Sequence, residues 1–178
     1  TKHGIPAVAL PPADYPDRAG HDAALLAAVR DSGAKAVVLA GYMRLISPDF
    51  VAAYRDRILN IHPALLPSFP GMHGQRDAAD YGVTIAGATV HFVDEQMDHG
   101  PVVIQAAVPA RPDDDAESLG ARIMTLEHRI YPQAVAWLAT GRLAIAGRKT
   151  RLAPSDAPPA DVSDVMPCLV NPPLEVGF

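Results

Sequence analysis

The chain has 178 residues, which is enough for one domain with a sizeable core. Hydrophobic residues make up 49% of it and charged residues 20%, a balance that suits a soluble globular protein better than a disordered one. The formal net charge is −5, and no cluster of Lys and Arg offers a nucleic-acid surface, so a small-molecule partner is favoured. A single cysteine, Cys168, excludes an internal disulfide and any multi-cysteine metal site. We expect a cytoplasmic protein without membrane contact, because no apolar run approaches the roughly 20 residues of a membrane-spanning helix and the start does not resemble a signal peptide.

The first third of the chain alternates helix and strand signals. Residues 36–40 form an almost unbroken apolar run, typical of a parallel strand that is covered on both faces. Ser47 and Pro48 are an N-cap and first-turn pair for a helix that we expect to reach about Arg55. The other elements expected here are a short apolar strand before Pro11, a polar loop over 11–20 that carries Arg18, an amphipathic helix over 21–32 and a strand over 58–61.

The remainder of the chain predicts a hairpin, a long helix and an irregular end. Residues 85–93 and 101–108 are expected to be paired strands around the polar loop 94–100, and a helix over 116–139 is capped by Asp115 or Ser118 and bent at Pro132. A short helix over 75–80 and a short strand over 143–145 complete the prediction. Together the elements indicate an α/β fold with an open, mostly parallel, twisted sheet flanked by helices. We expect residues 1–151 to form this domain and the proline-rich residues 152–178 to be irregular.

Asn60 and His62 are the first candidates for chemistry. Side chains alternate along a strand, so both residues project to the same side at the end of an apolar run. Pro63 then ends the strand, which leaves the two polar groups at the rim of the sheet. An amide and an imidazole held together can stabilise an oxygen atom that becomes negative during a reaction.

Asp98 and His91 are two further polar groups that could join them. Asp98 lies in a loop from which a carboxylate can reach inward, whereas the face on which His91 projects is not defined by the pattern. A carboxylate beside His62 would favour the imidazolium and raise the pKa of that ring, and Asp98 could accept the proton released by an attacking amine. The set therefore suits acyl transfer through a tetrahedral oxyanion.

Plainer interpretations stand beside this one. A histidine that follows an apolar strand is more often structural than catalytic, and Asp98 alone is an ordinary solvated acid. His62, His73 and His91 could bind a metal, but their spacing matches no compact ligand motif. Residues 43–46 include Met43, Leu45 and Ile46, which either pack in the interior or line an apolar slot for a flat ligand.

Four longer strings resemble a known family. GYMRLIS at 41–47, LNIHPALLPSFPGMHG at 59–74, GATVHFVDEQMDHGPVVIQ at 87–105 and LEHRIYP at 126–132 are similar to phosphoribosylglycinamide formyltransferases, the folate-dependent enzymes of de novo purine synthesis. The resemblance extends from about residue 1 to residue 148. Because several long motifs occur in the family's order, it is specific, and it implies the formyltransferase form of the Rossmann-like fold.

The resemblance also implies roles for individual residues. It makes Asn60, His62 and Asp98 the catalytic trio, with His62 as the proton donor and Asp98 as the group that raises its pKa. The donor would be 10-formyltetrahydrofolate, the acceptor the amine of glycinamide ribonucleotide, and no metal would be needed. Glu127 falls where the family contacts the ribonucleotide. The residues implied to contact the folate are Arg18, Met43, Arg44, Leu45, Ile46, Asn60, Asp94, Glu95, Gln96, Met97 and Asp98.

Two departures from the family leave other functions open. The family begins with a strand and a glycine-rich phosphate-binding turn that we do not find here, so we expect an N-terminal unit to be missing from the chain as given. A non-catalytic folate-binding fragment is therefore one alternative. The proline-rich stretch 152–178 has no obvious family counterpart. The runner-up activity is formyltetrahydrofolate hydrolysis, in which water replaces the amine, and a methionyl-tRNA formyltransferase is disfavoured because the tail is acidic rather than basic.

Overall fold

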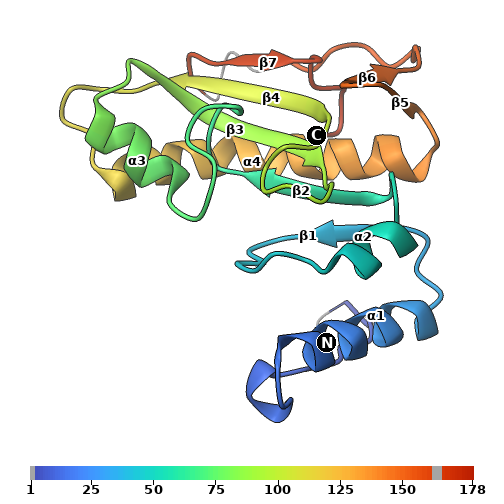
Figure 1. Ribbon diagram of the computed structural model, residues 1–178. Helices are drawn as coiled ribbons and strands as arrows, with labels where there is room; N and C mark the ends of the chain where they lie inside the picture. The colour runs from blue at the N-terminus through green and yellow to red at the C-terminus, as the bar shows by residue number, and fades with distance from the viewer. Residues whose placement is uncertain (1–2, 162–165) are drawn as a thin grey trace.

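A computed structural model of the chain describes residues 3–161 and 166–178, and these form an α/β structure built on one open sheet (Figure 1). The strands follow the order β1-β2-β3-β4-β6-β5, and β7 pairs with β4 away from that path. Their bounds are Val37–Leu39 (β1), Ile58–His62 (β2), Ile85–Phe92 (β3), Val102–Pro109 (β4), Leu143–Ala146 (β5), Lys149–Leu152 (β6) and Leu169–Asn171 (β7).

The helices occupy distinct places around this sheet. The long helix α4 packs against β2, β3 and β4, and α3 packs beside α4, whereas α1 and α2 lie at the β1 end of the molecule (Figure 1). Asp115 caps α4 through a reciprocal bond pair with Ser118, as the sequence predicts. The helix then continues past Pro132 to its end. The helical bounds are Pro12–Asp14 (a 3-10 turn, η1), Arg18–Asp31 (α1), Pro48–Ala53 (α2), Gly74–Tyr81 (α3) and Ala116–Ala139 (α4).

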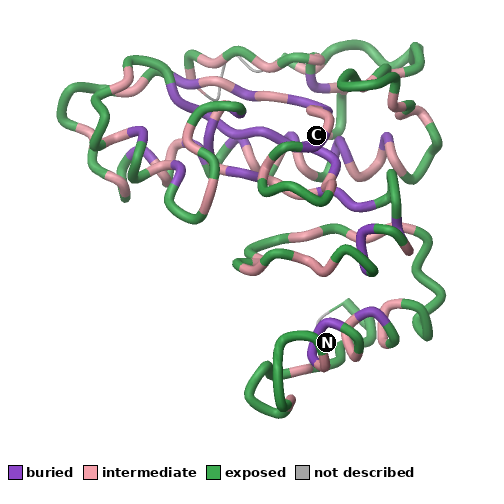
Figure 2. Tube along the Cα trace, in the orientation of Figure 1, coloured by how far each residue is buried: buried purple, intermediate pink, exposed green. Residues whose placement is uncertain are grey.

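Strands β3 and β4 form the predicted antiparallel hairpin, in which Gly87 lies opposite Ala107. A Cβ atom on Gly87 would come within 1.9 Å of the carbonyl oxygen of Ala106, so this position accepts no side chain without a backbone shift. Buried positions run along both strands, while the segments before β2 are mostly exposed or half-buried (Figure 2).

The sheet is mixed rather than mostly parallel. Among the described residues β1 and β2 are parallel, as are β4 and β6, while the four other pairings are antiparallel. The β3–β4 hairpin inserts at the centre of the sheet, and a hairpin reverses strand direction. The prediction of a strand covered on both faces is also wrong for β1, because Val38 is 43% exposed.

Two predictions near the N-terminus need correction. The short apolar strand expected before Pro11 is absent, since residues 5–11 have no regular structure. The side chains of Ile5 and Val8 are largely exposed there. The helix capped by Ser47 ends at Ala53, two residues earlier than expected.

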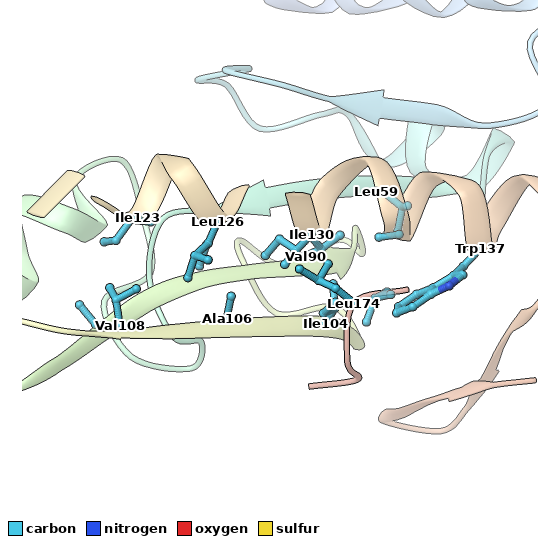
Figure 3. Close-up of a cluster of buried hydrophobic side chains, with 14 of the residues drawn as sticks. Leu59, Val90, Ile104, Ala106, Val108, Ile123, Leu126, Ile130, Trp137 and Leu174 are labelled. Carbon is cyan, nitrogen blue, oxygen red and sulfur yellow. The ribbon is translucent and has the colours of Figure 1, made fainter. Parts of the chain in front are cut away.

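The main core lies between α4 and the β2–β3–β4 part of the sheet (Figure 3). Figure 3 shows Leu126, Ile130 and Trp137 of α4 turned toward the side chains of the strands. A second, smaller cluster of Leu26, Phe50, Tyr54 and Ile58 joins α1 and α2 to β2. Burial of these apolar surfaces supplies the main stabilisation of the fold.

The described part of the proline-rich residues 152–178 contains little regular structure, but it packs on the domain. β7 pairs with β4, and Pro159 forms an isolated bridge with Glu175. Leu174 is only 1% exposed and belongs to the main core. Arg142 holds Glu175 with two bonds of 2.8 and 2.9 Å. The described tail is therefore part of the same packed unit as the sheet.

Candidate active site

A cavity of about 450 Å³ opens at the carboxyl ends of β1 and β2. In open α/β sheets this is the edge at which ligands bind. The walls come from four parts of the chain: residues 41–46 after β1, 60–63 at the end of β2, Gly71, Met72 and Gln75 around the start of α3, and 93–98 after β3. Leu39, His91 and Arg18 of α1 also line it. The candidate site is thus assembled from strand ends and loops that lie far apart in sequence.

His62 lies at the end of β2 with its ring largely buried, only 3% of the residue being exposed. Its Nε2 is 2.8 Å from the carbonyl oxygen of Phe69. A carbonyl only accepts hydrogen bonds, so Nε2 carries a hydrogen and donates it. The other ring nitrogen, Nδ1, is 3.5 Å from Oδ2 of Asp98 and is the one left for reaction.

Asp98 reaches the site from the loop between β3 and β4, as predicted. It adopts a positive φ of 50°, and the backbone N–H of Gly71 donates to its Oδ2 at 2.7 Å. Close packing of Gly100 fixes the end of the loop, because a Cβ atom there would lie 1.7 Å from the carbonyl oxygen of Phe92. The carboxylate is therefore held between the rings of His62 and His91 by a tightly constrained turn.

His91 is the member of the site whose position the sequence left open. It is the register partner of Asn60, and Nδ2 of Asn60 is 3.2 Å from its Nε2. Its Nδ1 donates to the carbonyl of Phe92 at 2.8 Å. Burial lowers the pKa of the His91 ring, although the Phe92 carbonyl and the Asp98 carboxylate act in the opposite direction. The neutral ring accepts a hydrogen bond from Asn60 and so fixes which way the Asn60 amide points.

A buried network missed at the sequence level shapes the loop after His62. The hydroxyl of Thr89 donates to the carbonyl of Ala64 at 2.7 Å and accepts from the N–H of Leu66 at 3.0 Å. Gln105 donates to the carbonyl of Leu66 at 2.9 Å. Thr89 and Gln105 are opposite each other in the hairpin, so pairing of the strands, once known, would have indicated this network.

The residues implied to contact a folate all line the cavity. Met43 and Leu45 are 62% and 47% exposed at its wall, and so could cover an apolar ligand. The guanidinium of Arg18 donates to the carbonyl of Leu45, and Arg44 contacts Nδ1 of His21 at 3.3 Å. Tyr42, Met72 and Gln75 also line the cavity and were not singled out from the sequence.

Glu127, the residue implied to contact a ribonucleotide, does not line this cavity. It lies half-buried on α4, and burial raises the pKa of its carboxyl group while His128 acts in the opposite direction. Its assignment stays a prediction.

Within residues 3–161 and 166–178 no group of three or more His, Cys, Asp or Glu side chains is arranged to hold a metal ion. The same residues contain no helix with the length and apolar character needed to span a bilayer.

An amide, an imidazole and a carboxylate gathered at the rim of an α/β sheet are groups suited to stabilising an oxyanion in acyl transfer. Comparison with known sequences narrows the class. The chain belongs to the formyl transferase family, whose sequence model, described as Formyl transferase, matches residues 1–135.

Several relatives of the chain have known activities or structures. It is 43% identical over 155 residues to the trifunctional purine biosynthetic protein adenosine-3 of Drosophila pseudoobscura pseudoobscura, covering 87% of this chain and 11% of that protein. It is 45% identical over 154 residues to the phosphoribosylglycinamide formyltransferase of Mycobacterium tuberculosis, covering 83% of this chain and 72% of that one.

Solved structures give the same family. The glycinamide ribonucleotide transformylase 1 of Symbiobacterium toebii matches with a TM-score of 0.78 and 50% identity, over 80% of this chain and 68% of that chain. A formyltetrahydrofolate deformylase from Pseudomonas syringae pv. tomato matches with a TM-score of 0.80 but only 29% identity, over 86% of this chain and 51% of that chain.

Proposed function

We propose that this chain carries the formyl-transfer chemistry of a phosphoribosylglycinamide formyltransferase, moving the formyl group of 10-formyltetrahydrofolate to the amine of glycinamide ribonucleotide in purine biosynthesis. The observation that carries the proposal is the convergence of Asn60, His62 and Asp98 on one cavity. The relatives named as such transferases support the choice of substrates. Both partners of the protein in this proposal are small molecules, and the folate acts as a co-substrate.

The reaction begins when the lone pair of the substrate amine attacks the formyl carbon. The carbonyl π electrons move to oxygen, and the resulting oxyanion accepts hydrogen bonds from the Asn60 amide and from His62. Asp98 takes the proton released by the attacking nitrogen, directly or through a water molecule. The intermediate then collapses, the bond between the formyl carbon and N10 of the folate breaks, and N10 keeps the electron pair and receives a proton from His62.

The hydrogen bonds of the site support these roles. The carbonyl oxygen of Phe69 accepts the hydrogen on Nε2 of His62. The proton is therefore donated from Nδ1, the ring nitrogen that faces Asp98. His91 engages the Asn60 nitrogen, which still has a second N–H free to donate to an oxyanion. The backbone N–H of Gly71 restrains the carboxylate of Asp98 close to the reacting groups.

The wall of the cavity supports folate binding. Met43, Leu45 and Ile46 would cover the flat ring system, and residues 94–98 would lie along it. Arg18 and Arg44 supply positive charge for the carboxylates of the folate. Glu127 is assigned to the ribonucleotide by the family motif alone.

Consumption of the formyl donor, measured with and without glycinamide ribonucleotide, tests the proposal. A transferase consumes the donor only when the ribonucleotide is present and forms the formylated ribonucleotide in equal amount. Equal consumption in both conditions would instead identify a hydrolase, an activity that the deformylase neighbour makes a specific alternative. Donor binding without any turnover would identify a folate-binding fragment.

A further inference from the structure

We propose that Arg55 and Arg148 are positioning residues that clamp the donor loop, defined here as residues 94–99, from two sides. The inference rests on the proposed function, because it assigns to this loop the placing of Asp98 beside the formyl group. Neither arginine lines the cavity, and neither is part of the catalytic trio. They act on the reaction through the acids of the loop.

Arg148 holds one end of the loop from the turn between β5 and β6. Its guanidinium donates to the carbonyl of His99 and lies 4.0 Å from Oδ2 of Asp94. The same Asp94 oxygen is 2.9 Å from Nδ1 of His99. Oδ1 of Asp94 accepts from the backbone N–H of Gln96 at 2.9 Å, so its carboxylate ties the first half of the loop to the last.

Arg55 holds the loop from the connection between α2 and β2. Its Nη2 is 2.7 Å from Oε1 of Glu95, the residue next to the one that Arg148 faces. This hydrogen bond is the largest cause of a lowered pKa of the Glu95 carboxyl, and the charge of Arg55 acts in the same direction. The two arginines therefore contact adjacent acids from opposite segments of the chain, 93 residues apart in sequence.

The clamp revises the roles of Asp94 and Glu95. Both line the cavity, but their carboxylates are bound to side chains of the protein, which leaves the backbone of the loop and Met97 to meet the folate. Asp98 follows directly in an unfavourable left-handed conformation, so a loop released from its anchors would let this carboxylate move away from His62. The two arginines therefore position the loop that carries Asp98, and they supply no charge at the reacting atoms.

The size of the effect follows from the exposure of the pairs. Arg55 and Arg148 have side chains that are 58% and 61% exposed, and exposed ion pairs are individually weak. We expect each single change to raise the KM for the formyl donor about twofold to threefold, and the double change to raise it about fivefold to tenfold. The KM for the ribonucleotide should stay within about twofold of the parent value in every variant.

The experiment compares Arg55→Ala, Arg148→Ala and the double variant with Arg151→Ala, an exposed arginine on the same hairpin as Arg148. Steady-state kinetics give the two KM values, and amide hydrogen exchange reports on residues 94–99 directly. Faster exchange of the loop together with a raised donor KM, absent in Arg151→Ala, is the expected result. Exchanging the charges in Arg55→Glu with Glu95→Arg should restore most of the donor affinity that Arg55→Glu alone removes.

The outcomes separate this inference from the proposed function. If the parent chain transfers no formyl group, the exchange rates and the dissociation constant of the formyl donor still test the clamp. Unchanged exchange in the double variant would overturn the clamp even in a fully active enzyme. A freed loop with an unchanged donor affinity and an unchanged kcat would overturn the positioning role.

Discussion

At the level of single residues, the site depends on which hydrogens each ring carries. Two backbone carbonyls, those of Phe69 and Phe92, fix one hydrogen on His62 and one on His91. The remaining nitrogen of His91 then accepts from Asn60, and the remaining nitrogen of His62 faces Asp98. Backbone groups therefore leave a different ring nitrogen free in each of the two histidines.

Replacing His91 with leucine tests its orienting role. His91→Leu leaves the Asn60 amide without its acceptor, so the amide can rotate away from the oxyanion. We expect kcat to fall about tenfold to hundredfold with little change in the KM for the formyl donor. His73→Leu, at an exposed histidine near the start of α3, should leave kcat unchanged. A kcat within twofold of the parent for His91→Leu would remove His91 from this role.

The buried His91 ring also predicts a pH dependence of stability. Its pKa is lowered in the folded state from the ordinary 6.5, so the unfolded chain binds a proton at a higher pH than the folded one. The contribution of the neutral His91 ring to the free energy of unfolding is fully present above pH 6.5. It is lost as the pH falls from that value toward the pKa of the ring in the folded state. Urea unfolding at pH 8, 6.5 and 5 should show a smaller loss for His91→Leu than for the parent chain. An equal loss of stability in His91→Leu and in the parent chain between pH 8 and pH 5 would contradict this assignment.

At the level of elements, the sequence predicts best where the pattern is local. The bounds of α4 follow from its capping residues, its apolar spacing and Gly141, and the structure agrees with them at both ends. The β3–β4 hairpin and the placing of Asn60 and His62 at a strand end also follow from short-range signals. The predicted, mostly parallel direction of strand pairing was wrong, because that direction depends on where the β3–β4 hairpin inserts in the sheet.

In the candidate site, too, the residues with local sequence signals could be predicted, and those that depend on long-range pairing could not. The family motifs contain Asn60, His62 and Asp98, and their meeting could be predicted from a shared sheet edge. The partner of Asn60 could not, because His91 is identified only by strand register. The clamp on the donor loop was also missed, since Arg55 and Arg148 contact it from segments that carry no motif.

The tight β3–β4 pairing gives a prediction for Gly87. Gly87→Ala would force a Cβ atom against the Ala106 carbonyl, so we expect it to lower the free energy of unfolding by roughly 3 kcal/mol or more. Gly20→Ala in α1 is the matched control, because its Cβ would have no contact closer than 3.4 Å and alanine favours a helix. Equal stability of both variants in urea unfolding would show that the hairpin tolerates a side chain at Gly87.

At the level of the whole molecule, the C-terminal segment completes the main core. Gln133 of α4 accepts from the N–H of Glu175, and Arg129 contacts the carbonyl oxygen of Phe178. Tyr131 connects the same helix to the strands at the site, with its hydroxyl 2.6 Å from the carbonyl of Leu39. One helix thus joins the tail to the strand ends that carry the candidate site.

Leu174 tests how much the tail contributes. Leu174→Ala removes a fully buried side chain and should lower the free energy of unfolding by about 2–4 kcal/mol, while the KM for the formyl donor stays unchanged because the residue does not line the cavity. Leu169→Ala, at a side chain that is 69% exposed, should change stability by less than about 0.5 kcal/mol. A stability loss below 1 kcal/mol for Leu174→Ala would mean that the tail is not part of the cooperative unit.

The central claim is that the charge of Asp98, held beside His62, drives formyl transfer. Asp98→Asn keeps the size of the side chain and an oxygen for the Gly71 N–H, but it removes the negative charge and the proton acceptor. The measurement is single-turnover transfer to glycinamide ribonucleotide together with the dissociation constant of the formyl donor. We predict a rate at least about hundredfold lower with donor binding within about threefold of the parent; a transfer rate close to that of the parent chain would contradict the claim.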